Sequence, residues 1–310
     1  MAKTAIDIIK SRLARQEILD KYGGEIPSSL WVANVSADEE VIQIEAKASK
    51  EAKNKAQRAI EETKVDPIQA KLLRKLYAAS GKCARNENSF SIMPANIVRR
   101  VVNFYSEPGE LVLDPCAGHN SRMQVTFDCG RSYIGYDVCS KFMEFNRQTA
   151  ETIQKRAGRS FFSGGKSCSI TLREQSSEKM KEADSTIDLI FTSPPYWDLE
   201  HYDDDPRQLG IGKTYNQFLE GMERVTLECL RVLKPGKFCV FNVNDFRKDG
   251  RFYPYHADTM NLFQKVGFNI FDVIIMAWPS LPFRSIFATQ VEATKQTGKQ
   301  HEFILVFKKP

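Results

Sequence analysis

Strand-like and helix-like segments alternate along the chain from about residue 90 onward, and this alternation limits the possible folds more than any other feature. Short apolar runs bounded by turn residues predict buried strands, and the segments between them place apolar residues at helical spacing. Strands that alternate with helices form a mostly parallel sheet, so we predict an α/β fold. The predicted strands lie at 111–114, 132–137, 186–191, 237–245, 269–278 and 301–309, and the predicted helices at 95–106, 141–157, 215–237 and 255–268.

The last two predicted strands are joined by a long segment without a clear helical pattern. A parallel connection normally needs a crossover helix, whereas antiparallel strands do not. We therefore predict a mostly parallel, twisted sheet with an antiparallel edge strand.

The first 85 residues have a different pattern, rich in Ala, Glu and Lys with apolar residues at helical spacing. Asp66 and Pro67 are typical of a helix start, and residues 26–36 predict a loop or a short strand. We predict two parts: a helical, charged N-terminal region (1–85) and an α/β domain (86–310). The charged faces are typical of solvated helices, and contact with DNA or a partner is the alternative.

Composition excludes several classes of protein. No apolar run in the 310 residues is long enough to span a membrane. The seven cysteines include no C-x-x-C pair, and the four histidines are far apart, so neither disulfides nor a metal site is expected. We expect a cytoplasmic protein, and its net charge of +5 is compatible with a nucleic-acid partner.

Ligands of open α/β sheets bind beyond the carboxyl ends of the strands, so the residues after each predicted strand are the candidate site. Asp114 ends one strand, and Gly118 permits a tight turn after it. Asp137 ends the next strand, about twenty residues after the glycine loop, where nucleoside-binding folds carry an acid that binds ribose hydroxyls. A helix N-cap is the alternative role of Asp137.

The next strand leads into Thr-Ser-Pro-Pro-Tyr-Trp (192–197). Pro194 and Pro195 have no N–H and fix the local backbone, so the segment offers hydrogen-bond acceptors but few donors. Such a segment suits a substrate that presents an amino group. Tyr196 provides a ring on which a flat base can stack.

Five segments together resemble the motifs of S-adenosylmethionine-dependent DNA amino-methyltransferases, which methylate cytosine N4 or adenine N6. These segments are LVLDPCAGHNSR (111–122), YIGYD (133–137), DLIFTSPPYW (188–197), RVLKPGKFCVFNV (231–243) and HEFILVFKK (301–309). The resemblance covers roughly residues 88–310. It implies a Rossmann-like methyltransferase fold, S-adenosylmethionine as cofactor, double-stranded DNA as partner and a place in a restriction-modification system of a bacterium or its phage.

The resemblance also assigns roles to residues. Cofactor binding falls to Asp114, Pro115, Ala117, Gly118, Asp137 and Ser193, and catalysis to Ser193, Pro194, Pro195 and Tyr196. The expected nucleic-acid contacts are Trp197, Arg247, Lys248, Arg251, Arg284 and Lys295. No separate DNA-recognition domain is evident, so the N-terminal region, these loops, a partner or a homodimer would share that task.

The sequence departs from the family pattern at three places. Cys116, His119 and Asn120 stand where relatives read DPFAGSG, and Asn120 can adopt the left-handed backbone that glycine would adopt there. The segment before the catalytic strand lacks the usual Gly-Asp, so Gln175 or Ser176 would serve the adenine. The cofactor loop precedes the catalytic motif, which is a circular permutation of the order in many relatives.

Ser193 before Pro-Pro-Tyr is more similar to the cytosine-N4 enzymes, and adenine N6 is the alternative target. RNA or a glutamine side chain as substrate, and a non-catalytic cofactor-binding protein associated with DNA, are further alternatives. Pro115-Cys116 is similar to the nucleophile motif of cytosine-C5 methyltransferases. Because it lies in the cofactor loop, we interpret Cys116 as a packing residue.

Overall fold

The computed structural model describes part of the chain, and the statements below concern that part: residues 29–32, 93–157, 168–199, 205–278, 294–297 and 299–310. The predicted helices of the N-terminal region and Arg284 lie outside these residues.

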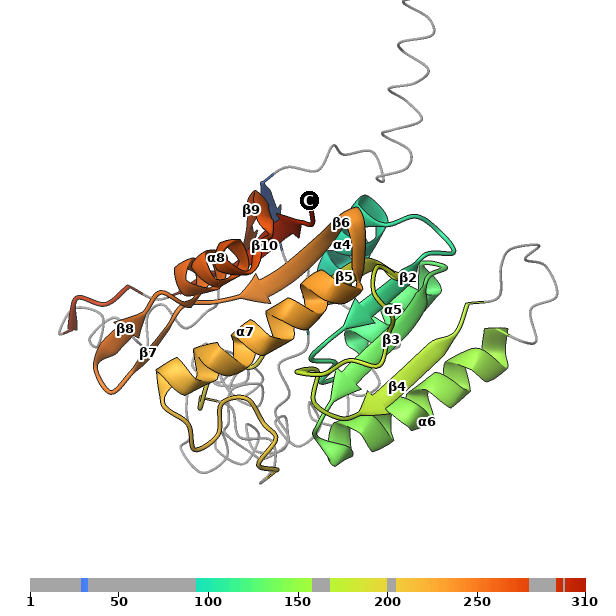
Figure 1. The fold of residues 1–310 in the computed structure, drawn as a ribbon, viewed down its shortest axis with the longest axis horizontal. Helices are drawn as coiled ribbons and strands as arrows, with labels where there is room; N and C mark the ends of the chain where they lie inside the picture. The colour runs from blue at the N-terminus through green and yellow to red at the C-terminus, as the bar shows by residue number, and fades with distance from the viewer. Residues whose placement is uncertain (1–28, 33–92, 158–167, 200–204, 279–293, 298) are drawn as a thin grey trace, which may run out of the picture.

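The described residues form an eight-stranded sheet in the order β1-β9-β10-β6-β5-β2-β3-β4 (Figure 1). Seven strands are parallel, and β10 runs antiparallel to both of its neighbours, β6 and β9. The mostly parallel α/β sheet with an antiparallel strand is confirmed. The antiparallel strand is β10, which lies near one edge of the sheet, with β9 and β1 beyond it. The strands are β1 (Leu30–Val32), β2 (Leu111–Asp114), β3 (Ser132–Asp137), β4 (Ile170–Glu174), β5 (Ile187–Thr192), β6 (Leu233–Val243), β9 (Asn269–Ala277) and β10 (His301–Lys308).

Helices cover both faces of this sheet. The helices α7 and α8 pack on one face through Phe218, Met222 and Phe263. The helix α4 packs on the other face, and α5 and α6 enclose Tyr133 of β3 beside it. The helices are α4 (Ala95–Tyr105), α5 (Ser121–Asp128), α6 (Ser140–Ala157), α7 (Tyr215–Val232) and α8 (Tyr255–Val266). None of the described helices is long and apolar enough to cross a membrane.

The short strand β1 confirms one of the two structures predicted for residues 26–36. It pairs in parallel with β9, and Trp31 is fully buried against α4 and the sheet. This part of the N-terminal region therefore belongs to the sheet, while the division of the chain near residue 85 stays a prediction.

The long helix predicted to reach residue 237 ends at Val232, and β6 begins at the next residue. Pro235 explains the difference, because the residue before a proline avoids the helical conformation and proline has no N–H to donate. The backbone of this segment pairs with the sheet instead: Leu233 lies opposite Ile187, and the Gly236 N–H donates to the Lys309 carbonyl.

Two features were not predicted. β4 is a half-buried strand beside β3. A small hairpin, β7 (Phe246–Lys248) and β8 (Arg251–Tyr253), follows β6 and extends from the carboxyl edge of the sheet (Figure 1). Its turn is Asp249-Gly250, both with positive φ (50° and 76°), which is a typical hairpin turn.

Candidate functional site

The loops that follow β2, β3, β4 and β5 surround one cavity at the carboxyl edge of the sheet. It holds about 960 Å³ of empty space, part of which is open to solvent. The position agrees with the expectation for an open α/β sheet. Its lining includes Pro115, Cys116, Gly118, His119 and Arg122 after β2, Asp137 to Cys139 after β3, Gln175 to Ser177 after β4, Ser193 to Trp197 after β5, and Arg207 to Gly210.

The loop after β2 makes a tight turn over β3. Gly118 has a φ of 49°, and the Ala117 N–H donates to the Tyr136 carbonyl over 2.7 Å. A side chain on Gly135 would lie 3.0 Å from the Ala117 Cβ, so glycine in β3 permits this close approach. The nearest atom to a Cβ on Gly118 would be 3.9 Å away, which leaves the loop backbone open to the cavity.

Asp137 connects this loop to β3 and faces the cavity. Its Oδ2 accepts the Gly118 N–H over 2.7 Å, and its Oδ1 accepts the Cys139 N–H over 2.8 Å. Burial raises the pKa of the Asp137 carboxyl to about 6, although both backbone donors lower it. The side chain thus caps the turn before α6 and still lines the cavity, so the two roles considered for it are compatible.

Asp114 and Ala117 do not line the cavity. Asp114 is fully buried, and its carboxylate accepts four hydrogen bonds. The donors are the Cys116 amide (3.2 Å), Thr192 Oγ1 (2.7 Å), Arg122 Nε (2.7 Å) and Tyr133 OH (2.9 Å). Asp114 therefore supports the cofactor loop from beneath.

Arg122 is the partner of Asp114 and was not predicted. Its side chain is 6% exposed, and its Nη2 donates to the carbonyls of Cys116 (2.6 Å) and Ala117 (3.0 Å). Asn120 precedes α5 with φ −63° and ψ −12°, so the expected left-handed conformation at Asn120 is wrong. The guanidinium holds the loop carbonyls in place without a second left-handed residue.

The motif Ser193–Tyr196 lines the cavity together with Gly118 and Asp137. The Tyr196 ring meets the buried Tyr255 ring edge-on, with 6.3 Å between centroids. Trp197 has a φ of 48°, and its Nε1 donates to the Lys213 carbonyl over 2.7 Å. The residues predicted for catalysis are therefore close in space to the predicted ribose acid.

The segment Arg207–Gly210 completes the cavity. A Cβ on Gly210 would lie 1.9 Å from the Trp197 carbonyl oxygen, so only glycine fits where this segment crosses the catalytic motif. The Lys213 Nζ donates to the Gln208 carbonyl over 2.7 Å.

Gln175 and Ser176 line the cavity beside β3, where the sequence analysis required residues to serve an adenine. Glu174 at the end of β4 pairs in register with Asp137. The Ser176 hydroxyl donates to Glu178 Oε2 over 3.1 Å, and the Gln175 amide donates to the Lys179 carbonyl over 3.1 Å. These contacts fix the segment as a wall of the cavity.

Three predicted nucleic-acid contacts lie on the β7–β8 hairpin. The Arg247 guanidinium lies 4.9 Å from the centroid of the Phe252 ring, and that of Arg251 lies 5.0 Å from the Tyr253 ring. Lys248 forms an ion pair with Asp198 and lies 4.5 Å from the centroid of the Trp197 ring. Trp197 therefore connects the hairpin to the catalytic motif.

Lys295 is exposed on the segment before β10. A polar contact lies at the base of the hairpin, where His256 Nδ1 is 2.6 Å from Asp245 Oδ1. The hairpin therefore carries cationic side chains that pack on aromatic rings.

Cys116 lines the cavity, but its chemistry does not suit a nucleophile. Burial, followed by the charges of Asp114 and Asp137, raises the pKa of its thiol well above the ordinary value. The described residues contain no group of three or more His, Cys, Asp or Glu that could hold a metal ion.

The Rossmann-like fold, with the glycine turn, Asp137 and the acceptor-rich motif around one cavity, is typical of a methyltransferase. The chain belongs to the DNA methylase family, whose model matches residues 7–148 and 187–310. This membership confirms the family that the sequence motifs resemble and the S-adenosylmethionine cofactor.

Relatives are similar over parts of the chain. The type II methyltransferase M.MthZI of Methanothermobacter thermautotrophicus is 30% identical over 144 residues, which are 41% of this chain and 40% of the relative. The type II beta methyltransferase M.BslI of a Bacillus species is 30% identical over 102 residues, 30% of this chain and 10% of the relative. The matches thus span less than half of either relative's length.

A Thermus thermophilus protein solved in complex with S-adenosyl-L-methionine is 30% identical over 42% of this chain and 50% of that chain, with a TM-score of 0.32. The cavity of the present chain fits an adenosyl cofactor on its own geometry. Gly118 leaves backbone open to the ligand, and the Asp137 carboxylate can accept hydrogen bonds from two ribose hydroxyls.

Proposed function

We propose that this chain is a DNA methyltransferase that moves a methyl group from S-adenosylmethionine to the exocyclic N4 amine of a cytosine rotated out of the duplex. One observation carries the proposal: Gly118 and Asp137 line the same cavity as the motif Ser193–Tyr196. A cofactor held by the first pair would therefore lie beside the acceptors of the second. The serine in the motif supports cytosine over adenine.

The chain acts by placing acceptors around an amine. The Ser193 hydroxyl and the Pro194 carbonyl can each accept an N–H of the target amino group, and neither proline donates a competing N–H. These bonds draw the nitrogen lone pair away from the ring and toward the methyl group. S-adenosylmethionine, when bound, supplies that methyl group already activated as a sulfonium, so positioning accounts for most of the catalysis.

Tyr196 receives the base. Extrusion costs a few kcal/mol of stacking and pairing, which ring stacking in the pocket partly offsets. The edge contact with buried Tyr255 fixes the orientation of the Tyr196 ring. The cavity opens to solvent, which can take the proton that the amine loses.

The duplex is proposed to lie against the β7–β8 hairpin. Arg247 and Arg251 are exposed there, and each guanidinium is stacked on an aromatic ring, which limits its freedom and leaves its N–H groups available for phosphates. Lys248 and Trp197 join this surface to the motif that would receive the extruded base.

Nucleoside analysis tests the proposal. The protein is incubated with double-stranded DNA and methyl-labelled cofactor, the DNA is digested, and the labelled nucleoside is identified. We expect N4-methylcytosine with the wild type and no label with Ser193→Ala. N6-methyladenine would replace the proposed target by the alternative. Label in RNA or protein alone would refute a DNA substrate, and cofactor binding without any transfer would support the non-catalytic alternative.

A further inference from the structure

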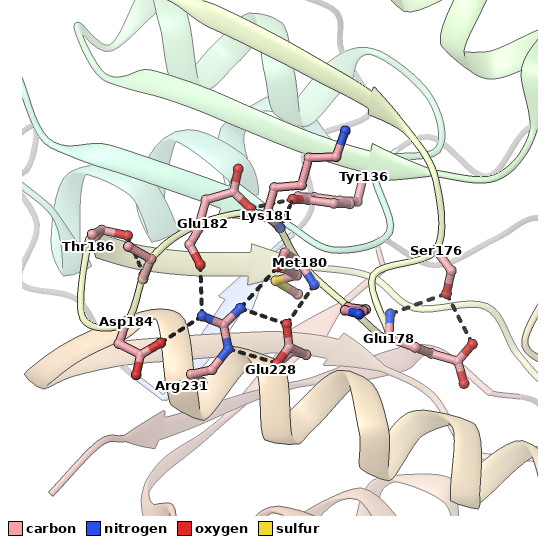
Figure 2. Close-up of polar contacts among 12 residues, drawn as sticks. Tyr136, Ser176, Glu178, Met180, Lys181, Glu182, Asp184, Thr186, Glu228 and Arg231 are labelled. Carbon is pink, nitrogen blue, oxygen red and sulfur yellow. Dashed lines mark hydrogen bonds and ion pairs between the residues drawn. The ribbon is translucent and has the colours of Figure 1, made fainter.

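The connection between β4 and β5 (residues 175–186) contains no helix or strand, yet its first three residues form a wall of the cavity. A segment outside helices and strands depends largely on side-chain contacts for its shape. Figure 2 shows contacts of this kind from α7 and from Tyr136 of β3, and Arg173 of β4 also pairs with Glu182 over 2.9 Å.

Arg231 on α7 makes three of these side-chain contacts. Its Nη1 donates to the Glu182 carbonyl and to Asp184 Oδ1, each over 2.8 Å, and its Nη2 donates to the Met180 carbonyl over 3.1 Å (Figure 2). Its own carbonyl accepts the Ser185 N–H over 3.0 Å. One side chain thus binds three successive parts of the connection.

Two more side chains of α7 continue this attachment toward the cavity. Glu228 accepts the Met180 N–H over 2.6 Å and pairs with Arg231 over 2.7 Å. Arg224 pairs over 2.7 Å with Glu178, whose other oxygen accepts the Ser176 hydroxyl. Positions 224, 228 and 231 follow the i, i+4, i+7 spacing of one helix face, so a single face of α7 reaches from Asp184 to Ser176.

We infer that Arg224, Glu228 and Arg231, the α7 brace, position Gln175–Ser177 and thereby set the affinity for the adenosyl part of the cofactor. None of the three brace residues lines the cavity, so they act through the wall that they hold. The inference rests on the proposed function.

The order of strands explains why the adenosyl part is affected. The cavity runs along the sheet from the catalytic motif after β5, past Gly118 after β2 and Asp137 after β3, to the wall after β4. With the ribose at Asp137, Gln175–Ser177 would hold the adenine of the cofactor, and the motif Ser193–Tyr196 would face its methyl group. Without the brace, the wall would have to be ordered when the ligand binds, which lowers affinity.

The test compares binding of S-adenosylhomocysteine and of adenosine by calorimetry in the full-length protein. Arg231→Met keeps the apolar stem and removes all the guanidinium contacts, and we expect the Kd of both ligands to rise about tenfold. Methyl transfer at saturating cofactor should retain its kcat, because the motif around Ser193 is untouched. Glu228→Gln, a milder variant, should raise both Kd values by a smaller factor and serves if Arg231→Met does not fold.

Lys265→Met is the matched control, because Lys265 pairs with Glu223 of α7 over 2.7 Å without contacting the connection. It should leave both Kd values unchanged. Wild-type Kd values in both brace variants would refute the positioning role, as would a fall in kcat without a change in Kd. Neither result would affect the proposed function, whereas failure of the wild type to bind either ligand would overturn both.

Discussion

Asp114→Asn tests whether this carboxylate supports the cofactor loop or contacts the cofactor. The wild-type side chain is fully buried and accepts from Arg122 Nε and Tyr133 OH at one oxygen, and from the Cys116 amide and Thr192 at the other. Asparagine has the same shape but only one acceptor atom. In either orientation its NH₂ group faces two groups that donate in the wild type.

The expected loss of stability follows from this geometry. The substitution leaves the guanidinium of Arg122 buried without its counter-charge, and breaking a buried ion pair in this way typically lowers the free energy of unfolding by about 3–5 kcal/mol. An exposed ion pair provides the comparison. Glu223→Gln removes the partner of Lys265 and should change the free energy of unfolding by about 1 kcal/mol or less.

Urea unfolding followed by linear extrapolation measures the difference. The double variant Asp114→Asn with Arg122→Met should be more stable than Asp114→Asn alone, because the unpaired charge is then gone. If Asp114→Asn kept the wild-type free energy of unfolding to within about 1 kcal/mol and lost only cofactor affinity, Asp114 would be a cofactor contact after all.

Further predictions concern the base, the ribose acid and the DNA surface. Tyr196→Ala should lower kcat/KM for DNA by about 10- to 100-fold, while the Kd of S-adenosylhomocysteine stays constant. Tyr196→Phe keeps the ring and should retain activity. Equal rates in the wild type and both variants would exclude stacking of the base on Tyr196. Burial raises the pKa of Asp137 to about 6, above the value of about 4 expected in an unfolded chain. The contribution of Asp137 to stability is therefore complete below about pH 4 and is lost as the pH rises through about 6. The unfolding free energy of the wild type minus that of Asp137→Asn should therefore decrease over this range, and a constant difference would contradict the shift. Arg247→Gln and Arg251→Gln should each reduce the slope of log binding constant against log salt by about 0.9, while Lys265→Gln should not; unchanged slopes would place the DNA elsewhere.

Local patterns in the sequence predicted most strands of the sheet and two of the segments that line the cavity. Apolar runs of strand length identified β2, β3 and β5, because buried parallel strands are almost continuously apolar. Similar runs identified β9 and β10. Gly118 and Asp137 were found from their place after such strands. The Asp249-Gly250 turn was an available signal for the hairpin, and it was missed because β7 and β8 have only three residues each.

Contacts between distant residues determined the rest. Asp114 was expected at the ligand because it ends a strand, yet Arg122, Tyr133 and Thr192 enclose it, and no local pattern predicts that three separate segments meet there. Arg231 looks like an ordinary charged residue near a helix end, and its partner Met180 is 51 positions away.

The sequence by itself determined most of the strands and the residues that follow them at the carboxyl edge, because these depend on neighbours within a few residues. Only the tertiary structure decided which polar side chains face the cavity and which are buried beneath it. That choice depends on packing between α7, the β4–β5 connection and the sheet, and packing partners are set by the path of the chain in space.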